Sequence, residues 1–154
     1  MYFAIVILLT FLLPAASIYT AVALLHSASP LIVLVGQWFV FWAGGIRLVL
    51  AGLRQFFQPS FTSREILGLT GDDALPFVRE LGIANFATGV VGTASLAVPS
   101  FVLPTAISAW IFCGVAGVRH LADRGRTKNQ NIAMVSDLFV SAVLAVYVAD
   151  AVIG

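Results

Sequence analysis

The stretch Leu75–Gly92, LPFVRELGIANFATGVVG, decides the fold. It is apolar enough to cross a bilayer, yet it carries two adjacent charges, Arg79 and Glu80, and one amide, Asn85. Ionisable groups inside a membrane are costly unless other groups pair with them. We therefore expect the rest of the chain to be arranged around this stretch and to supply the partners.

The same stretch carries a stripe of small residues, which are Gly82, Asn85, Gly89 and Gly92. Their spacing places them on one narrow face of a helix. Small residues let two helix backbones approach closely inside a membrane. The stripe therefore predicts a second helix packed tightly against this one.

Composition places the chain among membrane proteins. Of its 154 residues, 60% are hydrophobic and only 10% are charged, and the mean hydropathy is +1.03. Soluble domains carry about 25% charged residues. At about 20 residues per span, the chain has room for five or six spans and for no soluble domain. Its net charge of +1 gives no footprint for nucleic acid, so no nucleic-acid partner is expected.

The apolar runs predict an all-α fold, a polytopic membrane helix bundle of about five transmembrane helices in one domain over residues 1–154. The expected spans cover about residues 2–25, 31–57, 74–98, 104–122 and 132–153. No charged residue occurs from Leu81 to Val118. As one helix this run would be about twice as long as the membrane core is thick. The chain must therefore fold back, and Pro99–Pro104 is the expected turn.

The first apolar run has two interpretations. Residues 1–46 contain no Asp, Glu, Lys or Arg, and Tyr2–Leu25 is long enough to span. The alternative is a cleaved signal peptide with the small residues of Ala15–Ser17 or Ala21–Ala23 near the cleavage site, although the basic start of such signals is missing. Whether residues 1–25 are retained stays open at this point.

A polar stretch precedes the central segment. In it, Thr62 and Glu65 have the spacing of a capping box, which predicts a short surface helix stopped by Gly68. Asp72 or Asp73 is then expected to cap the next span.

Basic residues predict the orientation. Seven of the eight lie at or beside two loops, and these are Arg54, Arg64, Arg79, Arg119, Arg124, Arg126 and Lys128. Two spans separate the loops, so both loops lie on one side of the membrane, and the positive-inside rule makes that side cytoplasmic. We expect a multi-pass protein with its N-terminus in the cytoplasm and its C-terminus outside.

Three charged groups are expected at a similar depth. Arg47, Glu80 and Asp137 each lie six or seven residues, about 10 Å, inside their spans. We hypothesise that Arg47 pairs with Glu80, Asp137 or both. Asn85 would then complete the hydrogen bonds.

Further polar groups ring the expected cytoplasmic mouth of this cluster, namely Arg54, Arg79, Arg119 and His120. One interpretation is that all these groups only fix helix register. The other is a cytoplasm-facing cavity, in which the excess of arginine over carboxylate favours a lipid phosphate or a carboxylate. Gln37, Trp38 and Trp42 are candidates for an apolar lining, although packing against lipid is the stronger interpretation for the aromatic residues.

Several chemistries find no support. Cys113 is the only cysteine, which removes disulfides and thiolate clusters. His26 and His120 are expected at opposite membrane faces, so no metal site is predicted. Neither a glycine-rich phosphate loop nor a Gly-x-Ser-x-Gly elbow occurs. No catalytic residue is assigned, a non-enzymatic role is favoured, and no cofactor is expected apart from a quinone or a lipid.

Four motifs resemble an uncharacterised family of small bacterial integral membrane proteins, a domain of unknown function. They are GQWFVFW at Gly36–Trp42, GLRQ at Gly52–Gln55, RELGIAN at Arg79–Asn85 and SDLF at Ser136–Phe139. The resemblance covers most of the chain from about residue 30 onward, and the third motif is its most specific part. It implies a bacterial inner-membrane protein and supplies no activity.

A weaker resemblance is to the DoxX-like group of four-helix membrane proteins. Leu53–Gly92 carries it, with a polar loop that contains a proline and then a glycine-rich helix bearing Arg and Glu. Some DoxX-like proteins are associated with quinone-linked or thiol redox complexes. The chain departs from them in its expected fifth span and its lack of paired cysteines.

Three function classes follow. The favoured one is a protein that binds a lipid or small amphiphile, or that acts as an accessory or homo-oligomeric membrane subunit. The second is a small proton- or ion-coupled transporter with Arg47, Glu80 and Asp137 as coupling groups. The third is a quinone-linked redox partner, whose site would comprise Arg47, Glu80, Asn85 and His120.

Overall fold

The computed structural model describes residues 2–154, and all of their regular structure is helical. Helices make up 84% of the chain, with no strand in the part described. Four helical stretches in that part are long and apolar enough to cross a membrane, namely Tyr2–Leu24, Leu31–Phe57, Pro99–Ala122 and Lys128–Ile153. The predicted all-α membrane bundle is therefore confirmed.

The first two stretches are continuous helices with wider, π-type turns inside them. The first consists of α1 (Tyr2–Ile7), η1 (Leu8–Leu12), α2 (Leu13–Tyr19) and η2 (Thr20–Leu24). The second consists of α3 (Leu31–Phe39), η3 (Val40–Ile46) and α4 (Arg47–Phe57). In the first, Pro14 has no N–H and its ring would press on the carbonyl of Thr10, so the wider turn η1 relieves that contact.

A short helical segment follows, made of α5 (Pro59–Phe61) and η4 (Thr62–Ile66). This short helical segment is followed by a turn at Gly68, as predicted. The φ of Gly68 is +68°, which favours glycine. The predicted capping box is wrong, because the helix begins three residues earlier and leaves Thr62 buried inside it. The carboxylate of Glu65 instead accepts a hydrogen bond from Asn129.

Three longer helices complete the chain, namely α6 (Leu75–Ala94), α7 (Val102–Ala122) and α8 (Lys128–Ile153). A turn containing the short helix η5 (Pro99–Phe101) joins α6 to α7, so the predicted fold-back is confirmed. The predicted cap of α6 is wrong. No side chain caps this helix, and Asp72 forms an ion pair with Arg64 at 3.1 Å instead.

Helix α8 begins at Lys128, earlier than the predicted start near residue 132. Its capping box lies at Thr127, whose hydroxyl accepts from the N–H of Gln130 at 3.2 Å. The side chain of Gln130 in turn accepts from the N–H of Thr127 at 2.7 Å. Because this box satisfies N–H groups at the helix start, it extends α8 into the expected loop.

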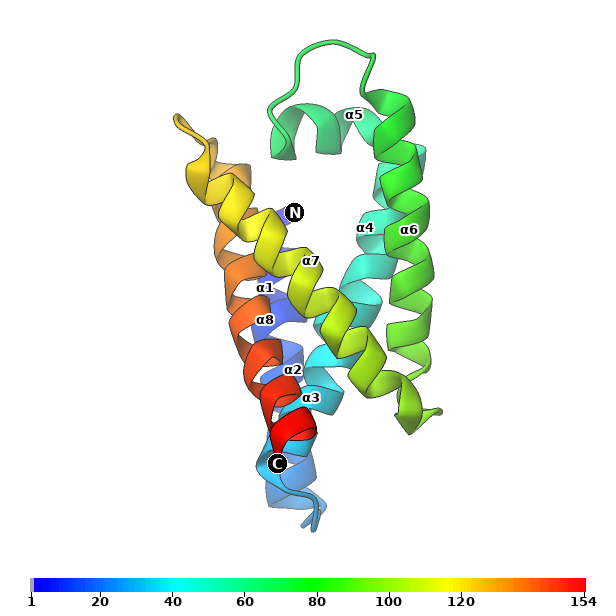
Figure 1. Ribbon diagram of the computed structural model, residues 1–154, viewed down its shortest axis with the longest axis vertical. Helices are drawn as coiled ribbons and strands as arrows, with labels where there is room; N and C mark the ends of the chain where they lie inside the picture. Colours follow the sequence, from blue (N-terminus) through cyan, green and yellow to red (C-terminus); the bar gives the residue numbers. More distant parts are fainter. Residues whose placement is uncertain (1) are drawn as a thin grey trace.

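The polar loops gather at one end of the molecule. Figure 1 shows α5, the loop before α6 and the loop between α7 and α8 together at this end, which we call the polar end (residues 58–74 and 123–127). Helix α1 begins toward the polar end and the C-terminus lies at the opposite end. The side of the membrane that each end faces stays a prediction.

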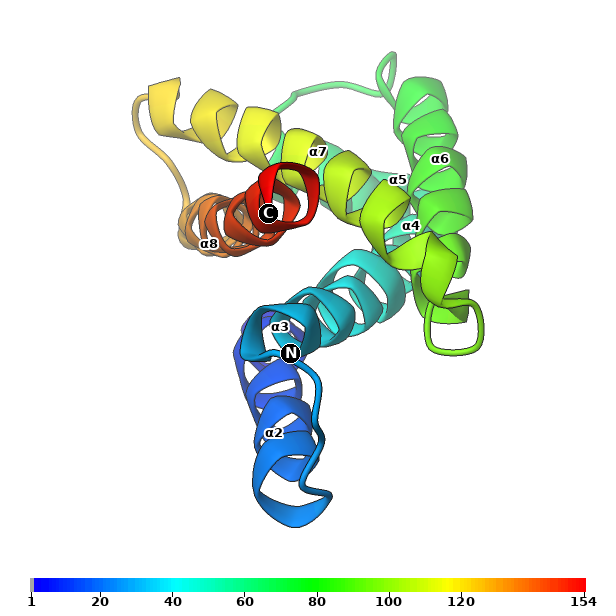
Figure 2. The same ribbon diagram turned by 60° about the horizontal axis from the view of Figure 1, so that its bottom comes forward.

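The central helix is α3–η3–α4, and α6 lies at the edge (Figure 2). Segments η3 and α4 pack along α6, while α3 and η3 also contact α7. The expectation that Leu75–Gly92 forms the centre is therefore wrong. Two adjacent glycines of η3 face different neighbours. Gly44 faces α7 at ordinary contact distance and Gly45 faces the backbone of α6 more closely, so this helix has a neighbour on two sides.

The glycine stripe of α6 packs against α4 and η3, as the sequence predicts for a helix partner. A Cβ atom added at Gly82 would lie 2.8 Å from the backbone oxygen of Gly52, and one at Gly52 would lie 2.6 Å from that of Gly82. A Cβ at Gly89 or Gly92 would also meet backbone atoms of the second stretch. The two backbones are thus in direct contact along most of α6.

Helix α6 is 20 residues long and is not among the four most apolar stretches. It nevertheless runs beside α4 and η3, and its outward side chains include the exposed apolar residues Phe77, Ile83 and Val90. We keep it as the predicted fifth pass on this basis.

Candidate functional site

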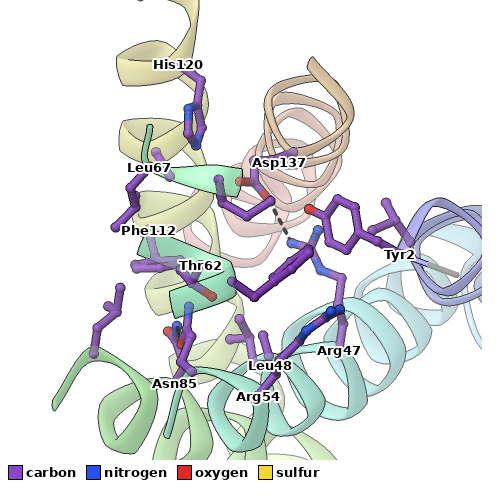
Figure 3. A pocket seen from close by; sticks show the side chains of 18 residues that line it. Tyr2, Arg47, Leu48, Arg54, Thr62, Leu67, Asn85, Phe112, His120 and Asp137 are labelled. Atoms are coloured by element: carbon purple, nitrogen blue, oxygen red, sulfur yellow. Dashed lines mark hydrogen bonds and ion pairs between the residues drawn. The ribbon is translucent and has the colours of Figure 1, made fainter. Parts of the chain in front are cut away.

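A cavity of about 170 Å³ lies near the polar end, and α1, α4, the α5–η4 segment, α6, α7 and α8 all contribute to its wall. Figure 3 shows side chains from these elements pointing into it. Its polar lining residues are Tyr2, Arg47, Arg54, Gln55, Thr62, Asn85, His120 and Asp137. Asp137 is the one acid in this lining, against two arginines.

Arg47 and Asp137 form the ion pair at the centre of the site. Nη2 of Arg47 lies 3.0 Å from Oδ1 of Asp137, and the two side chains are only 12% and 16% exposed. Arg47 also donates to the hydroxyl of Ser136 at 3.3 Å and to the sulfur of Cys113 at 3.4 Å. Three helices, α4, α7 and α8, are therefore joined through one guanidinium group.

The hypothesis about the partner of Arg47 is thus half right. Asp137 is the partner, whereas Glu80 is exposed and forms no ion pair within residues 2–154. Asn85 does not complete the network either. Its amide donates to the side-chain oxygen of Gln55 at 2.8 Å, in a separate buried pair.

Sequence reasoning missed Gln55, although the sequence carries a signal for it. The motif Gly52-x-x-Gln55 in α4 matches Gly82-x-x-Asn85 in α6. Residues three apart share a helix face. In the antiparallel packing of α4 on α6, Gly82 lies against Gln55 and Gly52 lies against Phe86, next to Asn85, so each glycine leaves room for the amide of the other helix. Tyr2 was missed because its whole segment reads as a plain apolar span.

Arg54 lies over the ring of Phe61, with its guanidinium carbon 3.5 Å from the ring centroid. Its Nε is buried without a hydrogen-bond partner in the part described. No carboxylate of residues 2–154 forms an ion pair with it. An arginine held on an aromatic face keeps its hydrogen-bond donors for another group.

His120 is buried at the end of α7 and lines the cavity from the polar end (Figure 3). Its Nδ1 lies 3.7 Å from a carboxylate oxygen of Asp123, with no hydrogen bond to it. Arg119, the neighbouring residue, does not line the cavity; it reaches the backbone oxygen of Leu67 at 3.5 Å and lies 3.8 Å from a carboxylate oxygen of Asp123. Arg79 is exposed on α6, outside the cavity.

The three candidates for an apolar lining lie away from this cavity. Trp42 donates through its indole nitrogen to the hydroxyl of Ser17 at 3.0 Å, which ties the second stretch to the first. Trp38 borders a separate hollow beside α2 and η2. Gln37 is half-buried on α3 and does not line the cavity. None of the three thus lines the cavity beside Arg47, and packing of the aromatic residues against lipid stays a prediction.

Comparison with known proteins gives a family for the chain. Residues 1–153 match a family of unknown function, DUF6790. The chain belongs to this family. No curated protein and no solved structure matches it.

Membership in DUF6790 confirms the resemblance to an uncharacterised family, and it carries no activity with it. The weaker resemblance to DoxX-like proteins stays a prediction. What this DUF6790 protein does must therefore be argued from the geometry of its cavity.

Proposed function

We propose that this DUF6790 protein is a non-enzymatic membrane protein that binds the anionic head group of a lipid or small amphiphile in the cavity beside Arg54. The observation that carries the proposal is the excess of positive charge in the cavity. The cavity holds two guanidinium groups and one carboxylate, and that carboxylate already pairs with Arg47. Arg54 is left without an acidic partner in a half-buried position.

The low dielectric of such a site strengthens the attraction between Arg54 and an anion. Two N–H groups of a guanidinium can also donate parallel hydrogen bonds to two oxygen atoms of a carboxylate or phosphate. The amides of Asn85 and Gln55 and the hydroxyl of Thr62 line the same cavity and add neutral polar groups. The site is therefore suited to an oxyanion.

The size and the remaining lining of the cavity fit an amphiphile. A single water needs roughly 10–15 Å³ on the same measure of volume, and the cavity offers about 170 Å³. The apolar part of its wall includes Leu48, Ala51, Leu81, Phe112 and Ala116. A charged head with several attached carbon atoms thus has both space and apolar surface.

Native mass spectrometry of the full chain extracted in a mild detergent tests the proposal. We expect a retained anionic lipid or fatty acid whose occupancy falls at least about fivefold in Arg54→Gln. Arg64→Gln is the matched control, because Arg64 is exposed at the same end and pairs with Asp72. A ligand-free spectrum, or equal occupancy in both variants, would overturn the proposal.

The same spectrum reports the copy number, and so it tests the predicted homo-oligomer or membrane complex. An intact mass of the purified chain also decides between retention and cleavage of residues 1–25. We further propose that the polar end faces the cytoplasm, since seven of the eight basic residues lie in or beside its loops. The test is a reporter enzyme that works only in the cytoplasm, fused to the C-terminus. Reporter activity in this fusion would contradict the proposed orientation.

A second candidate function is proton-coupled transport, and the Arg47–Asp137 pair inside the cavity favours it. Buried carboxylates paired with arginine often carry protons in transporters. The candidate predicts a flux in proteoliposomes that Asp137→Asn abolishes. Glu80 has no part in it, because this side chain lies outside the cavity.

A further inference from the structure

The polar end of the cavity is covered. Phe61 lies under Arg54, while Thr62 and Ser63 are buried. The covering α5–η4 segment is tied to α8, because Asn129 donates to the carboxylate of Glu65 at 3.1 Å. A ligand that arrives from water at this end would have to displace this segment.

The side of the cavity between α6 and α7 lacks such a cover. Helix α6 packs on α4, whereas α7 packs on α8, and the two meet near the turn that joins them (Figures 1 and 2). From there they diverge toward the polar end, where the cavity lies. No hydrogen bond or ion pair between side chains of α6 and α7 occurs in residues 2–154.

Three apolar lining residues on this side are also partly exposed. Leu81 comes from α6, and Phe112 and Ala116 come from α7. Phe112 lines the cavity and is 38% exposed, so its side chain lies between the cavity and the outer surface. Within a membrane, that surface faces lipid chains.

We infer that the cavity opens sideways into the membrane between α6 and α7, and that its occupant is a single-chain amphiphile with an anionic head. The head lies at Arg54, and the chain passes Leu81 and Phe112 into the lipid. The inference rests on the proposed function and adds to it the route and the ligand class. One chain is specified because the cavity is small and few residues border its open side.

A different route has to be separated from this one. An apolar groove of about 540 Å³ runs between α1 and α8, with Lys128 at its polar end. Val6 lines both this groove and the cavity, so the two spaces adjoin at its side chain. Ser136, which also lines the groove, accepts a hydrogen bond from Arg47 at 3.3 Å, so an acyl chain in the groove would be a rival route to the arginines.

The test is photolabelling of the full chain in nanodiscs with a palmitic acid that carries a photoreactive group on its chain. We expect labels on α6 and α7 around Leu81, Phe112 and Ala116, removed by excess palmitate and reduced at least about fivefold in Arg54→Gln. Ala116→Trp fills the opening and should lower labelling about tenfold. Val115→Trp is its matched control, because Val115 lies next to it on α7 and is 67% exposed.

Each outcome has a separate meaning. Competed labels on Phe3 or Val135 instead of α6 and α7 would overturn the sideways opening and leave the head-group site standing. Labels on α6 and α7 that Arg54→Gln does not reduce would overturn the proposed function and leave the opening standing. Because the wild-type pattern alone distinguishes the routes, the test holds even if Ala116→Trp fails to fold.

Discussion

Helix α4 and its extension η3 make two very different contacts, one with α6 and one with α8. Toward α6, glycines bring two backbones together, and within residues 2–154 the one side-chain hydrogen bond is that of the neutral pair Asn85 and Gln55. Toward α8, Arg47 extends a long charged side chain to Asp137, and the cavity adjoins this pair. Small residues close an interface, whereas a long ion pair holds two helices together and leaves space beside it.

The largest expected effect is on the ion-pair side. Arg47→Ala leaves Asp137 buried without a partner, which costs about 3–5 kcal/mol when one member of a buried pair is removed. We expect a sharp loss of folded yield and of melting temperature in detergent. The double variant Arg47→Ala/Asp137→Ala should recover part of the loss, and an unchanged melting temperature in the single variant would contradict the role of the pair.

The next largest effect is expected at the contact between the glycines of η3 and helix α6. A Cβ at Gly45 would lie 2.7 Å from the backbone nitrogen of Thr93, whereas one at Gly44 would lie 3.5 Å from the Cβ of Ala109. We expect Gly45→Ala to destabilise the protein by about 1–3 kcal/mol through overpacking. Its neighbour Gly44→Ala is the control and should change stability by less than about 0.5 kcal/mol. Equal melting temperatures of the two variants would refute close packing of α6 on η3.

A double-mutant cycle on Asn85 and Gln55 measures the amide pair. Hydrogen bonds between side chains of membrane helices contribute about 0.6 kcal/mol on average and up to about 1.7 kcal/mol. We expect a coupling in this range for Asn85→Ala with Gln55→Ala, from unfolding in mixed detergent. Asn129→Ala, which removes an exposed amide, combined with Gln55→Ala should show no coupling.

The smallest effect distinguishes the two acids. Glu80 is exposed on α6, so Glu80→Gln should change the free energy of unfolding by about 0.5 kcal/mol or less, as a surface substitution does. Asp137→Asn, measured in parallel, removes half of the buried ion pair and should destabilise the protein clearly. A similar loss of stability in both variants would show that Glu80 belongs to the polar cluster.

Much of the fold could be predicted from local sequence. The apolar runs predict the long helices, and Pro99–Pro104 predicts the turn between two of them. Helix starts were less predictable, because capping-box spacing occurs twice. Thr62–Glu65 has the spacing without the cap, whereas Thr127–Gln130 forms it, and the difference is that Pro59 already begins a helix before Thr62.

The candidate site was predictable only in part. Five of its candidates meet at one cavity, namely Arg47, Arg54, Asn85, His120 and Asp137. Glu80 falls outside it for a reason of helical geometry. It lies two residues before Gly82, about 200° around the helix, so turning the glycine stripe toward α4 turns Glu80 away.

The sequence by itself determined that this is a helical membrane protein, that one helix carries a stripe for close packing, and that Arg47 needs an acidic partner. Only the tertiary structure decided that α4 is central, that the partner is Asp137 and that Arg54 has none. The physical reason is that apolar patterning and charge are local properties of one helix. Which faces meet depends on the fit between several helices, and Gly45 lets η3 lie against the backbone of α6 while Gly44 faces α7.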